Sequence, residues 1–121
     1  MSTKTRILYL EDEPTNRMLF NYIFGNEFEV YLAKNAVEGR EKMKQHEIDI
    51  AISDYLMPGE NGLEFFKSIR GKHKPVRIIV SAYTEDGDIE EAVKMGAIDE
   101  LVSKPYEPDE LLELLRKYSL S

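Results

Sequence analysis

Apolar and polar residues alternate in blocks along the chain, and five short blocks are apolar and rich in β-branched residues. Short apolar runs of this kind are typical of strands that are buried in a parallel sheet. In the second run, apolar and acidic residues alternate, which indicates an edge strand with one solvated face. We expect the five strands at Arg6–Leu10, Phe28–Leu32, Ile48–Ser53, Val76–Ser81 and Leu101–Ser103.

In the segments between and after these runs, apolar residues recur at the spacing of a helix, which predicts five helices. Two of the expected starts carry a capping side chain, and two carry a proline at the first helical position. The expected starts lie at or beside Pro14, Asn35, Gly62, Asp88 and Pro108. We expect the second helix to run to about Gln45, the fourth to stop at Gly96 and the last to end near Tyr118.

Strand and helix patterns that alternate five times predict a single α/β domain over residues 1–121, with a doubly wound parallel sheet. Right-handed crossovers leave few topologies for such a sheet. Open parallel sheets bind ligands beyond the carboxyl ends of their strands. The residues that directly follow the strands are therefore the candidates for function.

The charge balance narrows the classes of partner. The chain carries 16 Lys and Arg residues against 23 Asp and Glu residues, a formal net charge of −7. This balance disfavours nucleic acid, because a general nucleic-acid binder needs a basic face. No apolar run approaches the ~20 residues that cross a bilayer, and the first residues lack the apolar stretch of a signal peptide. The absence of cysteine suits a reducing cytoplasm, so we expect a cytoplasmic location without membrane contact.

Polar side chains of distinct chemistry follow four of the five expected strands. Glu11 and Asp12 follow the first strand, Asp54 follows the third, Ser81 ends the fourth and Lys104 follows the fifth. Carboxylates that lie close together repel one another unless a cation or a lysine neutralises them. Hard oxygen ligands suit Mg²⁺, which binds through one or two carboxylates plus a phosphoryl oxygen. An aspartate whose charge is offset in this way is a plausible nucleophile.

Each of these residues also has an ordinary structural explanation when it is considered alone. The first acidic pair would form a solvated turn, and Asp54 would form an Asx turn before the Pro-Gly pair that follows. The Ser81 hydroxyl would satisfy hydrogen-bonding groups of the turn that follows its strand. Lys104 would lie at the surface, although Pro105 permits a cis peptide bond that could aim the lysine inwards. The combination, with one group per strand end, favours a functional site.

The chain resembles the receiver domain of the two-component response-regulator family in four segments, which are ILYLEDEP, DIAISDYLMPGENG, RIIVSAY and VSKPY. The resemblance covers essentially the whole chain. It implies a flavodoxin-like fold with five helices and a parallel sheet in the order 2-1-3-4-5. It also implies a switch in which Asp54 accepts a phosphoryl group from a phosphohistidine on a sensor histidine kinase or a histidine phosphotransfer protein. Such a domain catalyses only its own phosphorylation and autodephosphorylation.

The resemblance assigns metal ligands around the phosphoacceptor. Asp12 and Asp54 would hold Mg²⁺ directly, and Glu11 would act directly or through a metal-bound water. The backbone carbonyl of Leu56 would supply a further ligand. Phosphoryl transfer needs an in-line nucleophile and compensation of charge on the equatorial oxygens, and a divalent cation supplies part of that charge.

The resemblance also assigns the groups that would contact the phosphoryl group. Lys104 would pair with Asp54 and then with the phosphoryl oxygens. Ser81 would donate a hydrogen bond to one of these oxygens, and the backbone N–H of Ala82 would join it. Inward movement of Ser81 would shift the loop after the fourth strand and the helix beyond it. The surface formed by the fourth helix, fifth strand and fifth helix would change as a result.

The sequence departs from the family pattern at several of these positions. The family often has Asp where this chain has Glu11, which lengthens that metal arm, and Thr where this chain has Ser81. Leu101 stands where the family usually has a switch aromatic, and it cannot make a phenol hydrogen bond. Tyr83 could shield the phosphoryl group or take part in the switch, or it could lie on the loop surface. Pro105 completes the set of residues expected to modulate the switch.

The acidic residues are concentrated in one third of the chain. Residues 85–113 hold 11 acidic and two basic residues, a net charge of −9, whereas the remainder sums to +2. This third includes the fourth helix, the fifth strand and part of the fifth helix, a surface that the family uses for output or dimerisation. It would either be a solvated face or receive a basic output partner.

Three other classes of protein share features of this sequence. A pseudo-receiver would act only as an interaction module, but here every group needed for phosphorylation is present. A flavin-binding flavodoxin-like protein needs a hydroxyl- and Gly-rich phosphate loop where this chain has Glu11 and Asp12. A haloacid-dehalogenase-type phosphatase would carry a second Asp where Leu56 stands. The receiver could be free-standing or lead a longer chain, and no output motif follows it.

Overall fold

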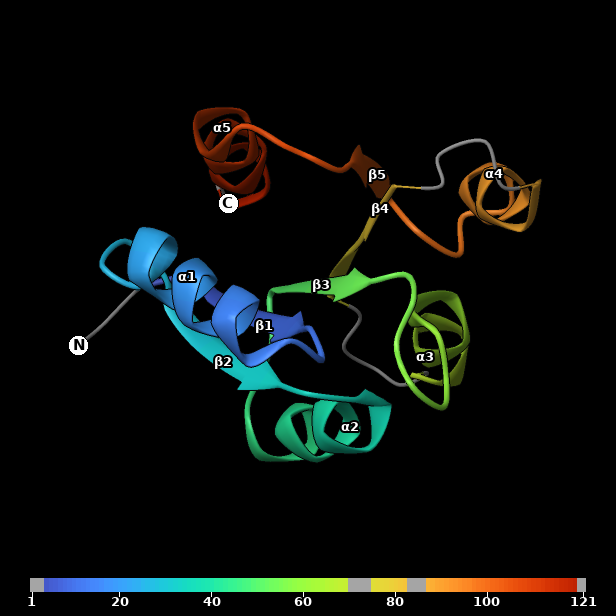
Figure 1. The fold of residues 1–121 in the computed structure, drawn as a ribbon, viewed down its shortest axis with the longest axis horizontal. Helices are drawn as coiled ribbons and strands as arrows, with labels where there is room; N and C mark the ends of the chain where they lie inside the picture. Colours follow the sequence, from blue (N-terminus) through green and yellow to red (C-terminus); the bar gives the residue numbers. More distant parts are fainter. Residues whose placement is uncertain (1–3, 70–74, 83–86, 120–121) are drawn as a thin grey trace.

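The computed structural model describes residues 4–69, 75–82 and 87–119 of the chain. Strands and helices alternate throughout this part of the molecule (Figure 1). The elements are β1 (Arg6–Leu10), α1 (Pro14–Phe24), β2 (Glu29–Ala33), α2 (Ala36–Gln45), β3 (Ile50–Asp54), α3 (Gly62–Ser68), β4 (Val76–Ser81), α4 (Gly87–Lys94), β5 (Glu100–Ser103) and α5 (Pro108–Ser119).

The strands form one parallel sheet in the order β2-β1-β3-β4-β5. The predicted topology is therefore confirmed, and β2 lies at an edge as its alternating pattern indicated. The expected strand bounds hold for β1 and β4. The third strand begins at Ile50, although the apolar run starts at Ile48, because Ile48 is fully buried without belonging to the strand.

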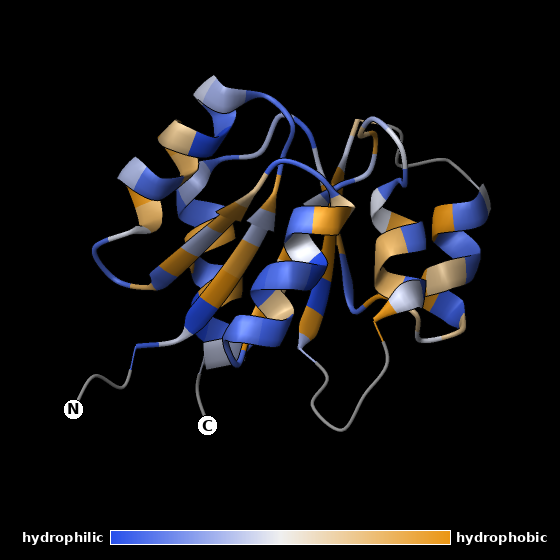
Figure 2. Ribbon diagram, turned by 90° about the horizontal axis from the view of Figure 1, so that it is seen from below, coloured by the Kyte–Doolittle hydropathy of each residue, from blue (hydrophilic) through white to orange (hydrophobic). Residues whose placement is uncertain are grey.

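Two apolar cores cover the two faces of the sheet. Helices α1 and α5 lie on one face, and α2, α3 and α4 lie on the other (Figure 1). Alternate residues of β1 serve the two cores, so that Ile7 and Tyr9 face α1 and α5, whereas Leu8 and Leu10 face the other helices. Figure 2 shows the hydrophobic residues concentrated along the strands between these helices.

Caps and turns fix where several helices begin and end. Asn35 caps α2 by accepting a hydrogen bond from the Glu38 N–H at 2.9 Å, as predicted. Asn61 and Glu64 form a capping box at the start of α3. The expectation that Asp88 caps the fourth helix is wrong, because α4 begins at Gly87 and Asp88 lies in its first turn. No helix in the described part of the chain is long and apolar enough to span a bilayer.

Candidate functional site

The carboxyl ends of β1 and β3 bring three carboxylates together. Glu11 and Asp12 directly follow β1, and Asp54 is the last residue of β3. One oxygen of each carboxylate lies within 4.8 Å of the others. Glu11 is 2% exposed and Asp54 is 9% exposed, whereas Asp12 is open to solvent. The structure thus places these predicted residues at one site, in a geometry that could hold a metal ion.

Glu11 has two carboxylate oxygens in different surroundings. Its Oε1 accepts a hydrogen bond of 2.8 Å from Nδ2 of Asn16, whereas the buried Oε2 has no hydrogen-bond partner among the described residues. Burial raises the pKa of Glu11, hydrogen bonding from Asn16 lowers it and the neighbouring Asp54 raises it again, so that the net shift is upward. A buried carboxylate oxygen without a partner is unfavourable, and a cation beside it would remove that penalty. The residues present therefore fit a divalent cation.

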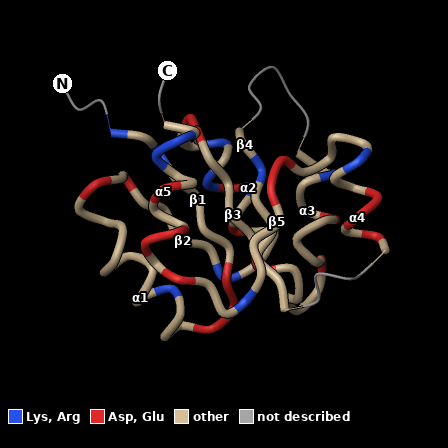
Figure 3. The backbone as a smooth tube through the Cα atoms, turned by 90° about the horizontal axis from the view of Figure 1, so that it is seen from above, with Lys and Arg blue, Asp and Glu red and all other residues tan. Residues whose placement is uncertain are grey.

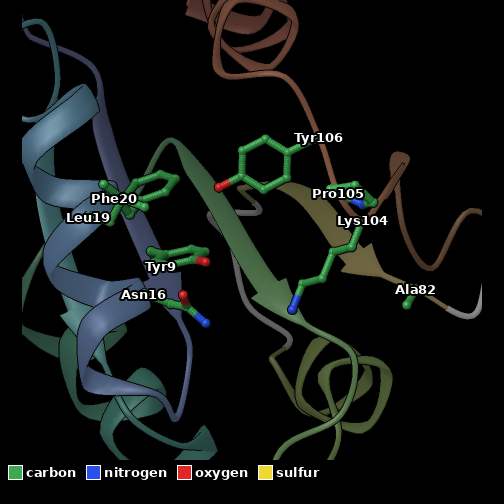
Figure 4. Close-up of a pocket in the computed structure, with 8 residues that line it drawn as sticks. All are labelled: Tyr9, Asn16, Leu19, Phe20, Ala82, Lys104, Pro105 and Tyr106. Atoms are coloured by element: carbon green, nitrogen blue, oxygen red, sulfur yellow. The ribbon is translucent and has the colours of Figure 1, made fainter.

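Lys104 directly follows β5 and reaches this group of carboxylates. Its Nζ lies 2.7 Å from Oδ1 of Asp54, and Figure 4 shows the side chain extended towards the end of β3. The backbone N–H of Lys104 donates to the Ser81 carbonyl at 3.0 Å, which ties the lysine segment to the end of β4. The peptide bond between Lys104 and Pro105 is cis. The lysine thus offsets part of the charge of the carboxylates.

Ser81 and Ala82 lie beside the aspartate on the neighbouring strand. Asp54 pairs with Val80 in the sheet, and Ser81 is the next residue of β4. Ser81 is 2% exposed, and Ala82 follows it at the surface. Their placement at this sheet edge agrees with the sequence expectation, while the hydrogen bonds to a phosphoryl group stay predictions.

The remaining predicted residues surround this site. Leu56 lies in the loop after β3, where its side chain is 54% exposed. Leu101 pairs with Ile79 in the sheet and packs against the core shared with α2, α3 and α4. Pro105 is exposed beside Lys104. Tyr83 lies outside the described residues, and the role of Leu56 as a backbone ligand stays a prediction.

A cavity of about 410 Å³ lies between α1 and the segment that follows β5. Figure 4 shows its walls, which comprise Tyr9, Asn16, Leu19, Phe20, Ala82, Lys104, Pro105 and Tyr106. The ring of Tyr9 stacks on that of Phe20 with centroids 4.0 Å apart. Burial raises the pKa values of Tyr9 and Tyr106, so both phenols stay protonated beside the carboxylates. The cavity joins the apolar side of α1 to the charged site.

Sequence reasoning missed two residues of this site. Tyr9 stands two residues before Glu11, and the alternation of side chains along a strand could have placed both on the same face. Asn16 stands in the first turn of α1, and its hydrogen bond to Glu11 depends on side-chain positions that no sequence motif records. Tyr106 packs against the core shared with α1 and α5.

The chain matches the family model of the response regulator receiver domain over residues 7–116. It is 35% identical to chemotaxis protein CheY of Bacillus subtilis over 115 residues, which cover 93% of this chain and 95% of CheY. It is 30% identical to the hydrogenase transcriptional regulatory protein HoxA of Bradyrhizobium diazoefficiens over 118 residues. That match covers 97% of this chain and 24% of HoxA, so the chain spans about a quarter of that relative.

Solved structures agree with these matches. The response regulator TrrA of Thermotoga maritima, in complex with Mg²⁺-BeF, has a TM-score of 0.81 and 34% identity, and the match covers 94% of this chain and 98% of TrrA. The chemotaxis response regulator CheY4 of Vibrio cholerae shares the fold, with a TM-score of 0.83 and 23% identity over 95% of this chain and 98% of CheY4. With its sheet order and the carboxylates and lysine at the ends of its strands, this chain belongs to the response regulator receiver domain family.

Proposed function

We propose that the chain is a phosphorylation-dependent switch in which Asp54 accepts a phosphoryl group. Receiver domains of this kind are phosphorylated by histidine kinases or phosphotransfer proteins. The observation that carries the assignment to Asp54 is its 2.7 Å contact with the Lys104 ammonium, at a sheet edge shared with Glu11 and Asp12. A carboxylate beside fixed positive charge can approach an anionic phosphoryl group.

The transfer needs little covalent help from the protein. An Asp54 oxygen attacks phosphorus, the bond from phosphorus to the donor imidazole breaks, and the imidazole nitrogen takes the electron pair. Lys104 compensates the charge on the phosphoryl oxygens, and Ser81 donates a hydrogen bond to one of them. Water later attacks the phosphorus and releases phosphate, which restores the carboxylate. The chain thus catalyses only its own phosphorylation and dephosphorylation.

Glu11, Asp12 and Asp54 would hold Mg²⁺, with the Leu56 carbonyl as a further ligand. When bound, this ion supplies positive charge that offsets the phosphoryl oxygens. Two observations support the assignment: no described residue donates a hydrogen bond to the buried Glu11 Oε2, and the structure of the related regulator TrrA is a complex with Mg²⁺-BeF.

The surface of α1 supports docking of the phosphodonor beside the site. Met18, Leu19 and Tyr22 are 72%, 54% and 82% exposed, and contiguous exposed apolar side chains mark interaction surfaces. Leu19 also lines the cavity that reaches Lys104. A sensor kinase or phosphotransfer protein that covers this row would bring its phosphohistidine towards Asp54, in the cytoplasm where we place the reaction.

The output surface is proposed to lie on α4, β5 and α5. Acidic residues line α4 (Figure 3), and the exposed Val93 and Met95 follow them along the chain. A partner with basic residues around an apolar contact would suit this surface. Movement of Ser81 towards the phosphoryl group would change it through β4 and α4.

The switch is tested by incubation with acetyl phosphate and Mg²⁺, followed by intact-protein mass spectrometry. We expect one labile phosphoryl adduct, which does not form when EDTA removes the metal before acetyl phosphate is added and which Asp54→Asn does not form. Absence of an adduct with both acetyl phosphate and a cognate phosphorylated histidine kinase would support a pseudo-receiver that acts only by binding.

A further inference from the structure

We propose that Asn16 is a positioning residue that holds the Glu11 carboxylate so that Oε2 faces the metal. The inference rests on the proposed Mg²⁺ site and concerns how this chain presents one of its ligands. Two observations on the Glu11 side chain support it. Asn16 donates a hydrogen bond to one carboxylate oxygen, and the other oxygen is buried with no hydrogen-bond partner in the part of the chain that the structure describes.

Glu11 needs such a restraint because its side chain has one more rotatable bond than an aspartate. A freely rotating carboxylate would place its oxygens in several orientations, and binding a metal would then require the loss of that freedom. Asn16 Nδ2 donates to Oε1 at 2.8 Å, which selects one orientation before the metal arrives. Oε1 is thereby occupied, and Oε2 is the oxygen left for a ligand.

The start of α1 holds Asn16 in place. Pro14 occupies the first helical turn, and Glu13 caps the helix by accepting a hydrogen bond from the Thr15 N–H. Arg17 adds a second link, since its Nη1 donates to the Glu11 backbone carbonyl at 2.7 Å. Consecutive residues of α1 therefore fix the Glu11 backbone and its carboxylate at the same time.

Partners of metal ligands commonly orient them in this way, and their loss typically lowers metal affinity about 10- to 100-fold. Asn16 lies on the exposed side of α1, where water can replace part of the lost bond. We therefore expect its loss to weaken Mg²⁺ binding roughly tenfold, at the lower end of that range.

The chain offers a matched control on the same helix. Asn21 is also an exposed asparagine of α1, but it lines a separate surface hollow near the C-terminal end of the helix. Asn16→Ala and Asn21→Ala thus make the same chemical change in the same helix. Asn16→Leu keeps the approximate side-chain volume without the amide and guards against an effect of truncation alone.

The test is a titration of the unphosphorylated protein with Mg²⁺, in which ¹H–¹⁵N NMR of the backbone amides measures binding. We expect both Asn16 variants to bind Mg²⁺ more weakly than wild type and Asn21→Ala to match wild type. In a Glu11→Asp background, Asn16→Ala should have little further effect, because the shorter side chain does not reach the amide.

The possible results separate this inference from the proposed function. Equal affinity in wild type and both Asn16 variants would overturn the positioning role while leaving the Mg²⁺ site intact. A loss of the same size in the Glu11→Asp background would also overturn it, since Asn16 would then act independently of Glu11. Absence of Mg²⁺ binding by the wild type would overturn the metal site and the positioning role together.

Discussion

Two ion pairs of equal length show how much the carboxyl edge of the sheet differs from the rest of the molecule. Lys104 contacts Asp54 at 2.7 Å, and Arg116 contacts Glu27 at the same distance. The Asp54 side chain is 12% exposed, whereas that of Glu27 is 42% exposed. Solvent screens the second pair, while the first lies beside two further carboxylates. Two ion pairs of equal length thus lie in different surroundings, one at the proposed phosphoryl site and one at the exposed surface.

The largest expected effect comes from breaking the first pair. Lys104→Met should slow phosphorylation by acetyl phosphate by about 10²-fold or more, because it removes the positive charge that, in the proposed mechanism, would stabilise the phosphoryl oxygens. Arg116→Met, the matched control, should leave the rate unchanged. The rates are measured by quenched mass spectrometry at fixed Mg²⁺, and equal rates for Lys104→Met and wild type would remove the lysine from the mechanism.

A second comparison concerns two glycines. A methyl group on Gly62 would lie 2.6 Å from the Asp54 carbonyl oxygen and 2.8 Å from Ile79 Cδ1, whereas one on Gly87 would meet no atom of the described residues within 4 Å. Gly62→Ala should therefore lower the free energy of unfolding by about 1–3 kcal/mol, the usual penalty for overpacking.

Gly87→Ala should leave stability unchanged or raise it slightly, since alanine favours a helix. Urea unfolding of the two variants measures the difference. A Gly62→Ala protein as stable as wild type would show that α3 can move away from the end of β3 without a loss of stability.

An effect of similar size is expected from the protonation of Glu11. Its pKa is raised in the folded protein, mainly by burial. Between the pKa of an unfolded glutamate and the raised pKa of Glu11, the folded state therefore binds more protons than the unfolded state. The free energy of unfolding of the metal-free protein should therefore fall as pH rises from the pKa of an unfolded glutamate to that of Glu11.

Glu11→Gln should abolish this part of the pH dependence and stabilise the metal-free protein at neutral pH by about 1–3 kcal/mol, because the buried oxygen no longer carries charge. Urea unfolding across pH, in EDTA, is the measurement. A variant that is less stable than wild type at neutral pH would contradict the unfavourable burial of the carboxylate.

The smallest expected effect separates two tyrosines. Tyr9 is 4% exposed and lines the cavity, whereas Tyr22 is 82% exposed on α1. Tyr9→Phe keeps the stacked ring and removes the hydroxyl, so we expect a change of a few-fold or less in the phosphorylation rate, against none for Tyr22→Phe with acetyl phosphate. A change of more than about 10²-fold in Tyr9→Phe would place the phenol in the chemistry itself.

The sequence could predict the features that follow from the order of strands, helices and strand-end residues along the chain. Polar residues at strand ends meet because parallel strands share a carboxyl edge, so Glu11, Asp54 and Lys104 could be brought together before any coordinates. An apolar run reports burial rather than strand pairing, which is why Ile48 was placed in a strand that begins at Ile50. The bond from Asn16 to Glu11 depends on a rotamer, and no pattern of residue types records it.

The central claim is that Asp54 is the phosphoacceptor, and direct mapping of the modified residue tests it most sharply. The protein is phosphorylated with acetyl phosphate and Mg²⁺, the acyl phosphate is reduced with borohydride, and the products are located by peptide mass spectrometry. The account predicts conversion to homoserine at Asp54 alone. Conversion at Asp12, reduction at Glu11 or the same yield of product in Asp54→Asn would contradict it.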